Sequence, residues 1–181
     1  TFSLYSRGVI LRIRLAEKAK IDVKLRPVLP DHLPREWRDH PDVKCEYDIK
    51  PQSRSAACRM RNTLSAKKAR RLIKGVELEG LFQREQLEFL KHAKKLSLDL
   101  ASLRIYGPTR IDSWSSKRFS FELAIVRLKS NQFLAEISTR KGSSDESYEW
   151  RLLSLARSKN MKICRSQDSK TKRILSSLRR L

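Results

Sequence analysis

The stretch from Gly8 to Val28, GVILRIRLAEKAKIDVKLRPV, alternates apolar and polar residues on both sides of a short polar turn. Successive side chains of a strand point to opposite faces, so this pattern predicts two strands joined as a hairpin. One face is apolar and carries Leu11, Ile13, Leu15, Ile21, Val23 and Leu25. The other face carries one acid, Asp22, and four cations: Arg12, Arg14, Lys24 and Arg26.

The basic face of this hairpin has two possible environments. In an ordinary antiparallel sheet the polar face is turned to water. In a closed barrel the same face would line the interior with positive charge, and a cavity of that kind binds polyanions. The hairpin pattern alone leaves both arrangements open.

The overall charge points to the same class of partner. The 181 residues hold 41 Lys and Arg against 20 Asp and Glu, which gives a net charge of +21. Such a charge attracts polyanions: nucleic acid, polyphosphate or an anionic membrane surface. No apolar run approaches the length of a membrane span, so we expect no membrane-embedded segment.

The cysteines predict an intracellular location. Cys45, Cys58 and Cys164 form an odd set without CxxC spacing. Because disulfides favour oxidising compartments, we expect reduced thiols in a cytoplasmic protein. His32 and His40 lie in a proline-rich segment and have no partners at metal-ligand spacing, so we expect both on the surface.

A second alternating segment, Val43 to Lys50, carries acids. Glu46 and Asp48 are two residues apart, so both carboxylates point to the same side of a strand. Carboxylate oxygens suit Mg²⁺ or Mn²⁺, which also bridge phosphate oxygens. The alternative is a strand face whose acids form ion pairs with Arg or Lys on a neighbouring strand.

The remaining elements are predicted from periodicity and capping residues. Ser65 is expected to cap a helix that ends near Gly75 and contains the run KKARR, residues 67–71. This run is a candidate nucleic-acid contact, although such runs are more often solvated helix faces. Further predictions are a helix over 83–95 with His92 on its surface, strands over 53–61, 117–127, 133–140 and 162–164, and a C-terminal helix.

The segment LYSRGVILRIR followed by VKLRP resembles the CYTH superfamily, the triphosphate tunnel metalloenzymes. The positions that match the family pattern are Leu4, Gly8, Leu11, Arg12, Arg14 and Lys24. The segments KCEYDIK and FLAEISTRK are similar to the family's acidic strands, and SQDSKTKRIL is similar to its C-terminal basic element. The Glu-x-Glu-x-Lys strand with which the family begins is not found in this sequence.

The resemblance implies one α+β domain over residues 1–181, an antiparallel β-barrel or tunnel with helices packed outside, lacking the family's first strand. It implies a phosphate clamp formed by Arg12, Arg14, Lys24, Arg26, Arg110, Arg118, Arg140 and Lys170. Glu46, Asp48, Glu122 and Glu136 would be the ligands of Mg²⁺ or Mn²⁺. The expected activity is metal-dependent hydrolysis of a triphosphate or polyphosphate.

Three other functions compete with this one. A catalytically degenerate tunnel would bind polyphosphate or a nucleotide without turnover, and the missing glutamates favour it. A class IV-like adenylyl cyclase would use the same cationic clamp and metal. A nucleic-acid-binding protein would use the net positive charge, with affinity that falls steeply with salt.

Overall fold

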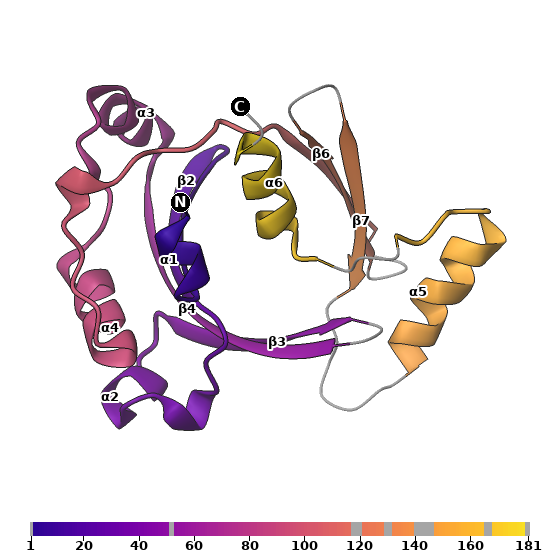
Figure 1. Cartoon of the computed structure of the whole chain (residues 1–181), viewed down its shortest axis with the longest axis horizontal. Helices are drawn as coiled ribbons and strands as arrows, with labels where there is room; N and C mark the ends of the chain where they lie inside the picture. The colour runs from indigo at the N-terminus through magenta and orange to yellow at the C-terminus, as the bar shows by residue number, and fades with distance from the viewer. Residues whose placement is uncertain are drawn as a thin grey trace. The chain divides into compact units, whose positions relative to one another are not determined.

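The structure is a computed structural model of the 181-residue chain, and it describes residues 2–50, 53–116, 121–128, 132–139, 147–164 and 168–179. The chain divides into two units. The N-terminal unit contains Thr1–Ile49 and Ser53–Ile105, and the C-terminal unit contains Lys50–Gln52 and Tyr106–Leu181. Antiparallel sheets and helices confirm the predicted α+β class (Figure 1). The described strands form two separate sheets, and no closed barrel is found among them.

The N-terminal unit contains a four-stranded sheet with the order β1-β2-β4-β3. The strands are β1 (Val9–Leu15), β2 (Lys18–Leu25), β3 (Val43–Lys50) and β4 (Ser53–Ser65). β1 and β2 form the predicted hairpin, in which Leu11 faces Val23 and Arg12 faces Asp22. β4 pairs with β2 and extends four residues beyond the predicted end at Arg61.

The helices of this unit are α1 (Ser3–Ser6), α2 (Arg35–Arg38), α3 (Ala66–Gly75) and α4 (Arg84–Lys94), with short 3-10 turns η1 (Pro30–His32), η2 (Leu78–Gly80) and η3 (Leu100–Ser102). Of these four helices, α3 and α4 begin at residues whose side chains cap them. The Ser65 side chain accepts a hydrogen bond of 3.2 Å from the Lys68 amide, which confirms the predicted cap of α3. A reciprocal pair of hydrogen bonds between Gln83 and Gln86 caps α4.

The core lies between one face of the sheet and the helices α3 and α4, which lie on the same side of β2 and β4 (Figure 1). Ile21, Val23 and Leu25 of β2 are fully buried there, together with Phe89 of α4. Gln86 is also buried, and its side-chain amide donates to the backbone carbonyls of Ile21 and Met60. Since the apolar face packs against the helices, the charged residues of β1, β2 and β4 are placed on the opposite face.

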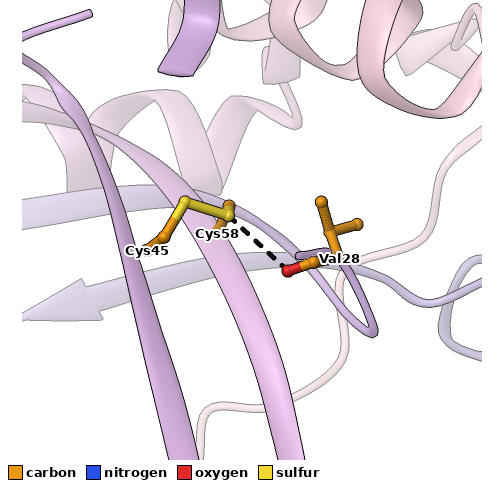
Figure 2. The surroundings of a disulfide bond; sticks show 3 residues. All are labelled: Val28, Cys45 and Cys58. Atoms are coloured by element: carbon orange, nitrogen blue, oxygen red, sulfur yellow. Dashed lines mark hydrogen bonds between the residues drawn. A yellow bond between two sulfur atoms is a disulfide. The ribbon is translucent and has the colours of Figure 1, made fainter. Parts of the chain in front are cut away.

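Cys45 of β3 and Cys58 of β4 form a disulfide, with their Cα atoms 4.0 Å apart (Figure 2). The Cys58 sulfur also lies 3.7 Å from the carbonyl oxygen of Val28. The prediction of reduced thiols is therefore wrong for these two residues, and the thiol argument for a cytoplasmic location no longer holds. Spacing along the chain does not reveal which cysteines face each other across neighbouring strands. Cys164 is exposed.

The C-terminal unit contains the three-stranded sheet β5-β6-β7, formed by β5 (Ile111–Ser116), β6 (Phe121–Arg127) and β7 (Phe133–Thr139). It also contains helices α5 (Ser147–Ser158) and α6 (Lys170–Arg179). The predicted strand over 162–164 is wrong, because these residues are irregular and three alternating residues are too few to define a strand. In the described part of the chain, no helix is both long and apolar enough to cross a membrane.

Candidate functional site

The face of the four-stranded sheet opposite the core gathers charged side chains, and we call it the cationic face. It consists of Arg12, Arg14, Asp22, Lys24, Arg26, Glu46, Asp48, Arg59 and Arg61. The strand register places Arg12, Asp22 and Arg61 in one row across β1, β2 and β4, and Lys24 beside Arg59 in the next. Six positive charges against three negative ones leave these nine residues with a surplus of positive charge, and Lys20, which is opposite Arg14 in the register, adds one more cation to the same side of the sheet.

Asp22 is the centre of this face. Its side chain is 0% exposed and accepts hydrogen bonds from three arginines. The distances to Oδ2 are 3.0 Å from Arg12 Nη2 and 2.7 Å from Arg14 Nη2, and the distance to Oδ1 is 2.7 Å from Arg61 Nε. One buried carboxylate therefore fixes the positions of three guanidinium groups that would otherwise repel one another.

The environment of Asp22 acts on its pKa in two directions. Burial raises the pKa of a carboxyl group, because it disfavours the charged form. The hydrogen bond from Arg61 and the charges of Arg14 and Arg12 outweigh burial, and the pKa of Asp22 lies below its ordinary value. Asp22 is therefore ionised at neutral pH.

The acids of β3 pair with the cations at the end of β2. Lys24 Nζ lies 2.8 Å from Glu46 Oε1 and 3.5 Å from Asp48 Oδ2, and Arg26 pairs with the same Asp48 oxygen. Burial lowers the pKa of Lys24, and the hydrogen bond to Glu46 opposes this shift. For Glu46, burial raises the pKa, but the contact with Lys24 outweighs it and the pKa falls below the ordinary value.

Part of the cationic face has no acceptor. The Nε atoms of Arg12, Arg14 and Arg26 are buried and make no hydrogen bond within the described residues. Arg59 makes no hydrogen bond or ion pair with the residues that the structure describes, and burial and the charge of Arg61 lower its pKa. Burial and the charge of Arg12 likewise lower the pKa of Arg14. Buried N–H groups normally have a partner, so these three Nε atoms are unsatisfied among the described residues.

Gly8 sets the position of Arg26 through the backbone. The Gly8 carbonyl accepts a hydrogen bond of 2.8 Å from the Arg26 amide. Gly8 has φ of +73°, and a Cβ atom built there would lie 1.8 Å from the Arg26 carbonyl oxygen. Only glycine fits this close approach of the chain, which brings Arg26 to the edge of the cationic face.

The metal ligands expected from the CYTH resemblance fall into two groups. Glu46 and Asp48 lie in the N-terminal unit and are paired with cations as described. Glu122 and Glu136 lie on one face of the C-terminal sheet, where Glu122 faces Ser138 and Glu136 forms an ion pair of 2.7 Å with Lys170. Among the described residues, no three or more His, Cys, Asp or Glu side chains are grouped so as to hold a metal ion.

The expected phosphate ligands divide in the same way. Arg12, Arg14, Lys24 and Arg26 are brought together on the cationic face. Lys170 pairs with Glu136, and Arg110 is exposed and pairs with Asp112 at 3.0 Å. Arg118 and Arg140 lie outside the described residues.

Two members of the site, Arg59 and Arg61, were not predicted as anion ligands. Their signal was present in the sequence, because both alternate with the buried residues Cys58 and Met60 of β4. The alternation indicates a strand with a basic face. The alternation does not indicate which strands lie beside β4. In the observed sheet order β4 lies between β2 and β3, and this order brings Arg59 and Arg61 next to the charged residues of β2.

A second polar cluster lies at the junction of α2 and α4. His92 Nδ1 lies 3.0 Å from Trp37 Nε1 and 2.8 Å from Glu36 Oε1. These residues line a cavity of about 460 Å³ together with His40, Arg84, Glu85 and Glu88. His92, predicted at the helix surface, is partly exposed but joins the two helices.

Comparisons of the chain with models of known protein families, with curated proteins and with solved structures find no match. The CYTH resemblance stays a prediction that rests on the motifs quoted above. The geometry of the cationic face supplies the independent basis for a function.

Proposed function

We propose that the cationic face binds a linear oligophosphate, such as tripolyphosphate. The observation that carries this proposal is the surplus of positive charge on the face, where Arg59 forms no hydrogen bond or ion pair among the described residues. Phosphate oxygens are matched to guanidinium donors, which bind them through two parallel hydrogen bonds. A bound anion would also offset the mutual repulsion of the six cations.

The spread of the cations favours a chain of phosphates over a single phosphate. The row formed by Arg12, Asp22 and Arg61 crosses three strands, which is about 10 Å at the usual spacing of strands in a sheet. Lys24 and Arg59 extend the positive charge along the strand direction. A ligand with several linked phosphoryl groups can contact these cations at the same time.

The acids of the face have different roles in this proposal. Asp22 is fully buried, and each of its three arginines has five N–H donors, so they can bind phosphate while still holding Asp22. Glu46 and Asp48 are partly exposed at 47% and 33%. Phosphate oxygens would compete with these two carboxylates for Lys24 and Arg26. In the tunnel implied by the CYTH resemblance, this face would form one wall.

Metal-dependent hydrolysis of the bound chain is the second candidate. Mg²⁺ is commonly held by one or two carboxylates together with substrate phosphates. Glu46 and Asp48 both contact Lys24, so their carboxylates lie close enough to act together. As they stand, both are neutralised by Lys24 and Arg26, so these residues do not fit a preformed metal site. We therefore place binding first.

Calorimetric titration with tripolyphosphate, pyrophosphate and phosphate tests the binding proposal. We expect affinity to rise with chain length. Arg59→Gln should weaken tripolyphosphate binding about tenfold, since a charge-assisted hydrogen bond contributes about 1.5 kcal/mol. Arg59 has no ion-pair partner in the described chain, so this variant should leave the fold intact. Arg157→Gln, an exposed arginine on α5, is the matched control.

The outcomes separate the two candidates. Absence of tripolyphosphate binding by the folded wild type, or equal affinities of the Arg59 and Arg157 variants, would refute the binding proposal. Phosphate release is measured in parallel with and without Mg²⁺ and Mn²⁺. Metal-dependent release that disappears in a Glu46→Gln, Asp48→Asn variant would establish hydrolysis, whereas binding without release would limit the function to binding.

A further inference from the structure

The helix α3 presents a row of cations to solvent, which we call the α3 basic stripe: Lys67, Arg70, Arg71 and Lys74. Residues at i, i+3, i+4 and i+7 share one face of an α-helix. Ala69 and Leu72, on the opposite side, are buried in the core. The basic stripe therefore points directly away from the body of the N-terminal unit.

The charge of this stripe is not compensated. All four side chains are exposed, and α3 contains no acidic residue. Within the described residues, none of the four forms an ion pair or a side-chain hydrogen bond.

The stripe is separate from the cationic face of the sheet. Ala69 and Leu72 belong to the same core cluster as Ile21 and Val23, which point away from the cationic face. The core of the unit therefore lies between the two basic surfaces. A ligand on one surface does not contact the other, so each can be altered independently.

The chemistry of the stripe distinguishes among polyanionic partners. Interfacial helices bury an apolar face in the membrane, but the apolar face of α3 is already buried in the protein core. Proteins that bind single strands stack bases on aromatic side chains, and α3 has none. A duplex backbone requires only an array of cations, and it carries one charge per about 1.7 Å of its axis.

We propose that the α3 basic stripe contacts the phosphate backbone of a nucleic-acid duplex. Lys67 to Lys74 spans about 10 Å along the helix axis, which matches several successive phosphate charges of the duplex. Contacts of this kind position a protein on the duplex and carry no sequence information. The surface is therefore assigned to sequence-independent binding.

The test is fluorescence anisotropy with a 20-base-pair duplex at several salt concentrations. The stripe variant replaces Lys67, Arg70, Arg71 and Lys74 with Gln. The control variant replaces four exposed cations elsewhere with Gln: Lys91, Arg104, Lys159 and Lys162. Both variants lose the same net charge, so a difference between them reports the location of the charge. Circular dichroism checks that both remain folded.

We expect the stripe variant to lose about four units from the slope of log K against log salt, and the control variant about one or fewer. The stripe variant should bind tripolyphosphate as the wild type does, because its four residues lie outside the cationic face. Equal losses in the stripe and control variants would overturn the proposal, as would failure of the wild type to bind duplex. Binding of the wild type to anionic vesicles but not to duplex would instead assign the stripe to a membrane surface and equally refute it.

Discussion

Replacing Asp22 with Asn tests the idea that one buried carboxylate organises the cationic face. The substitution preserves the shape of the side chain, and the Oδ1 acceptor of Arg61 is retained. The oxygen that accepts from Arg12 at 3.0 Å and from Arg14 at 2.7 Å becomes an amide donor. Two short charge-assisted hydrogen bonds are lost, together with the longer contact of 3.5 Å from Arg61 Nη2, and the new amide N–H₂ group then faces these guanidinium donors.

The expected cost follows from these two bonds. A hydrogen bond to a charged group contributes about 1.5 to 3 kcal/mol. The arginine side chains around Asp22 keep between 26% and 41% exposure, so water screens them and the lower value applies. We therefore expect Asp22→Asn to lower the free energy of unfolding by about 3 kcal/mol at pH 7. Urea denaturation monitored by tryptophan fluorescence measures it.

The pH dependence provides an independent check. The pKa of Asp22 is lower in the folded protein than in the unfolded chain, so its ionisation stabilises the fold above the unfolded value of about 4. That contribution is lost as the pH falls through the depressed pKa of the folded state. The difference in the free energy of unfolding between the wild type and Asp22→Asn should be constant above about pH 5 and shrink below about pH 4. A difference under about 1 kcal/mol at pH 7 would refute the central role of Asp22.

Three further predictions concern other parts of the N-terminal unit. Gly8→Ala should lower the free energy of unfolding by more than about 2 kcal/mol, because its Cβ atom would meet the Arg26 carbonyl; urea denaturation measures this, and an unchanged midpoint would contradict it. Lys24→Met should weaken tripolyphosphate binding about tenfold and strengthen Mn²⁺ binding, because Glu46 and Asp48 lose their shared cation. Calorimetry measures both affinities, and an unchanged Mn²⁺ affinity would show that the two acids do not act together. Replacing both Cys45 and Cys58 with Ala should lower the free energy of unfolding by about 3 kcal/mol. A reductant should lower the stability of the wild type but not of this variant, and an equal effect on both would argue against the disulfide.

Local features of the fold were predictable from the sequence. The alternation in residues 9–25 placed Leu11, Ile13 and Val23 on the buried side of a hairpin, as the register confirms. Ser65 was correctly predicted as the cap of α3, because a helix start has a short-range chemical signature. These signals depend on residues within one turn or one hairpin of each other.

Contacts between distant strands were not predictable in the same way. Lys24 and Glu46 are 22 residues apart, and Asp22 and Arg61 are 39 residues apart. Their contacts depend on the order β1-β2-β4-β3, in which β4 lies between β2 and β3. Alternation indicates which face a residue occupies but not which strand lies beside it. For this reason the part played by Arg59 was missed.

The bond between Cys45 and Cys58 also fixes how β3 slides along β4. In a sheet, a shift of one residue in the register turns every side chain to the opposite face. For β3 such a slip would carry Glu46 and Asp48 away from Lys24 and Arg26 and bring Val43 and Tyr47 onto the charged side. Among the described strands, β3 lies at the edge of its sheet and pairs only with β4. The covalent link therefore fixes the register in which Glu46 and Asp48 lie beside Lys24 and Arg26.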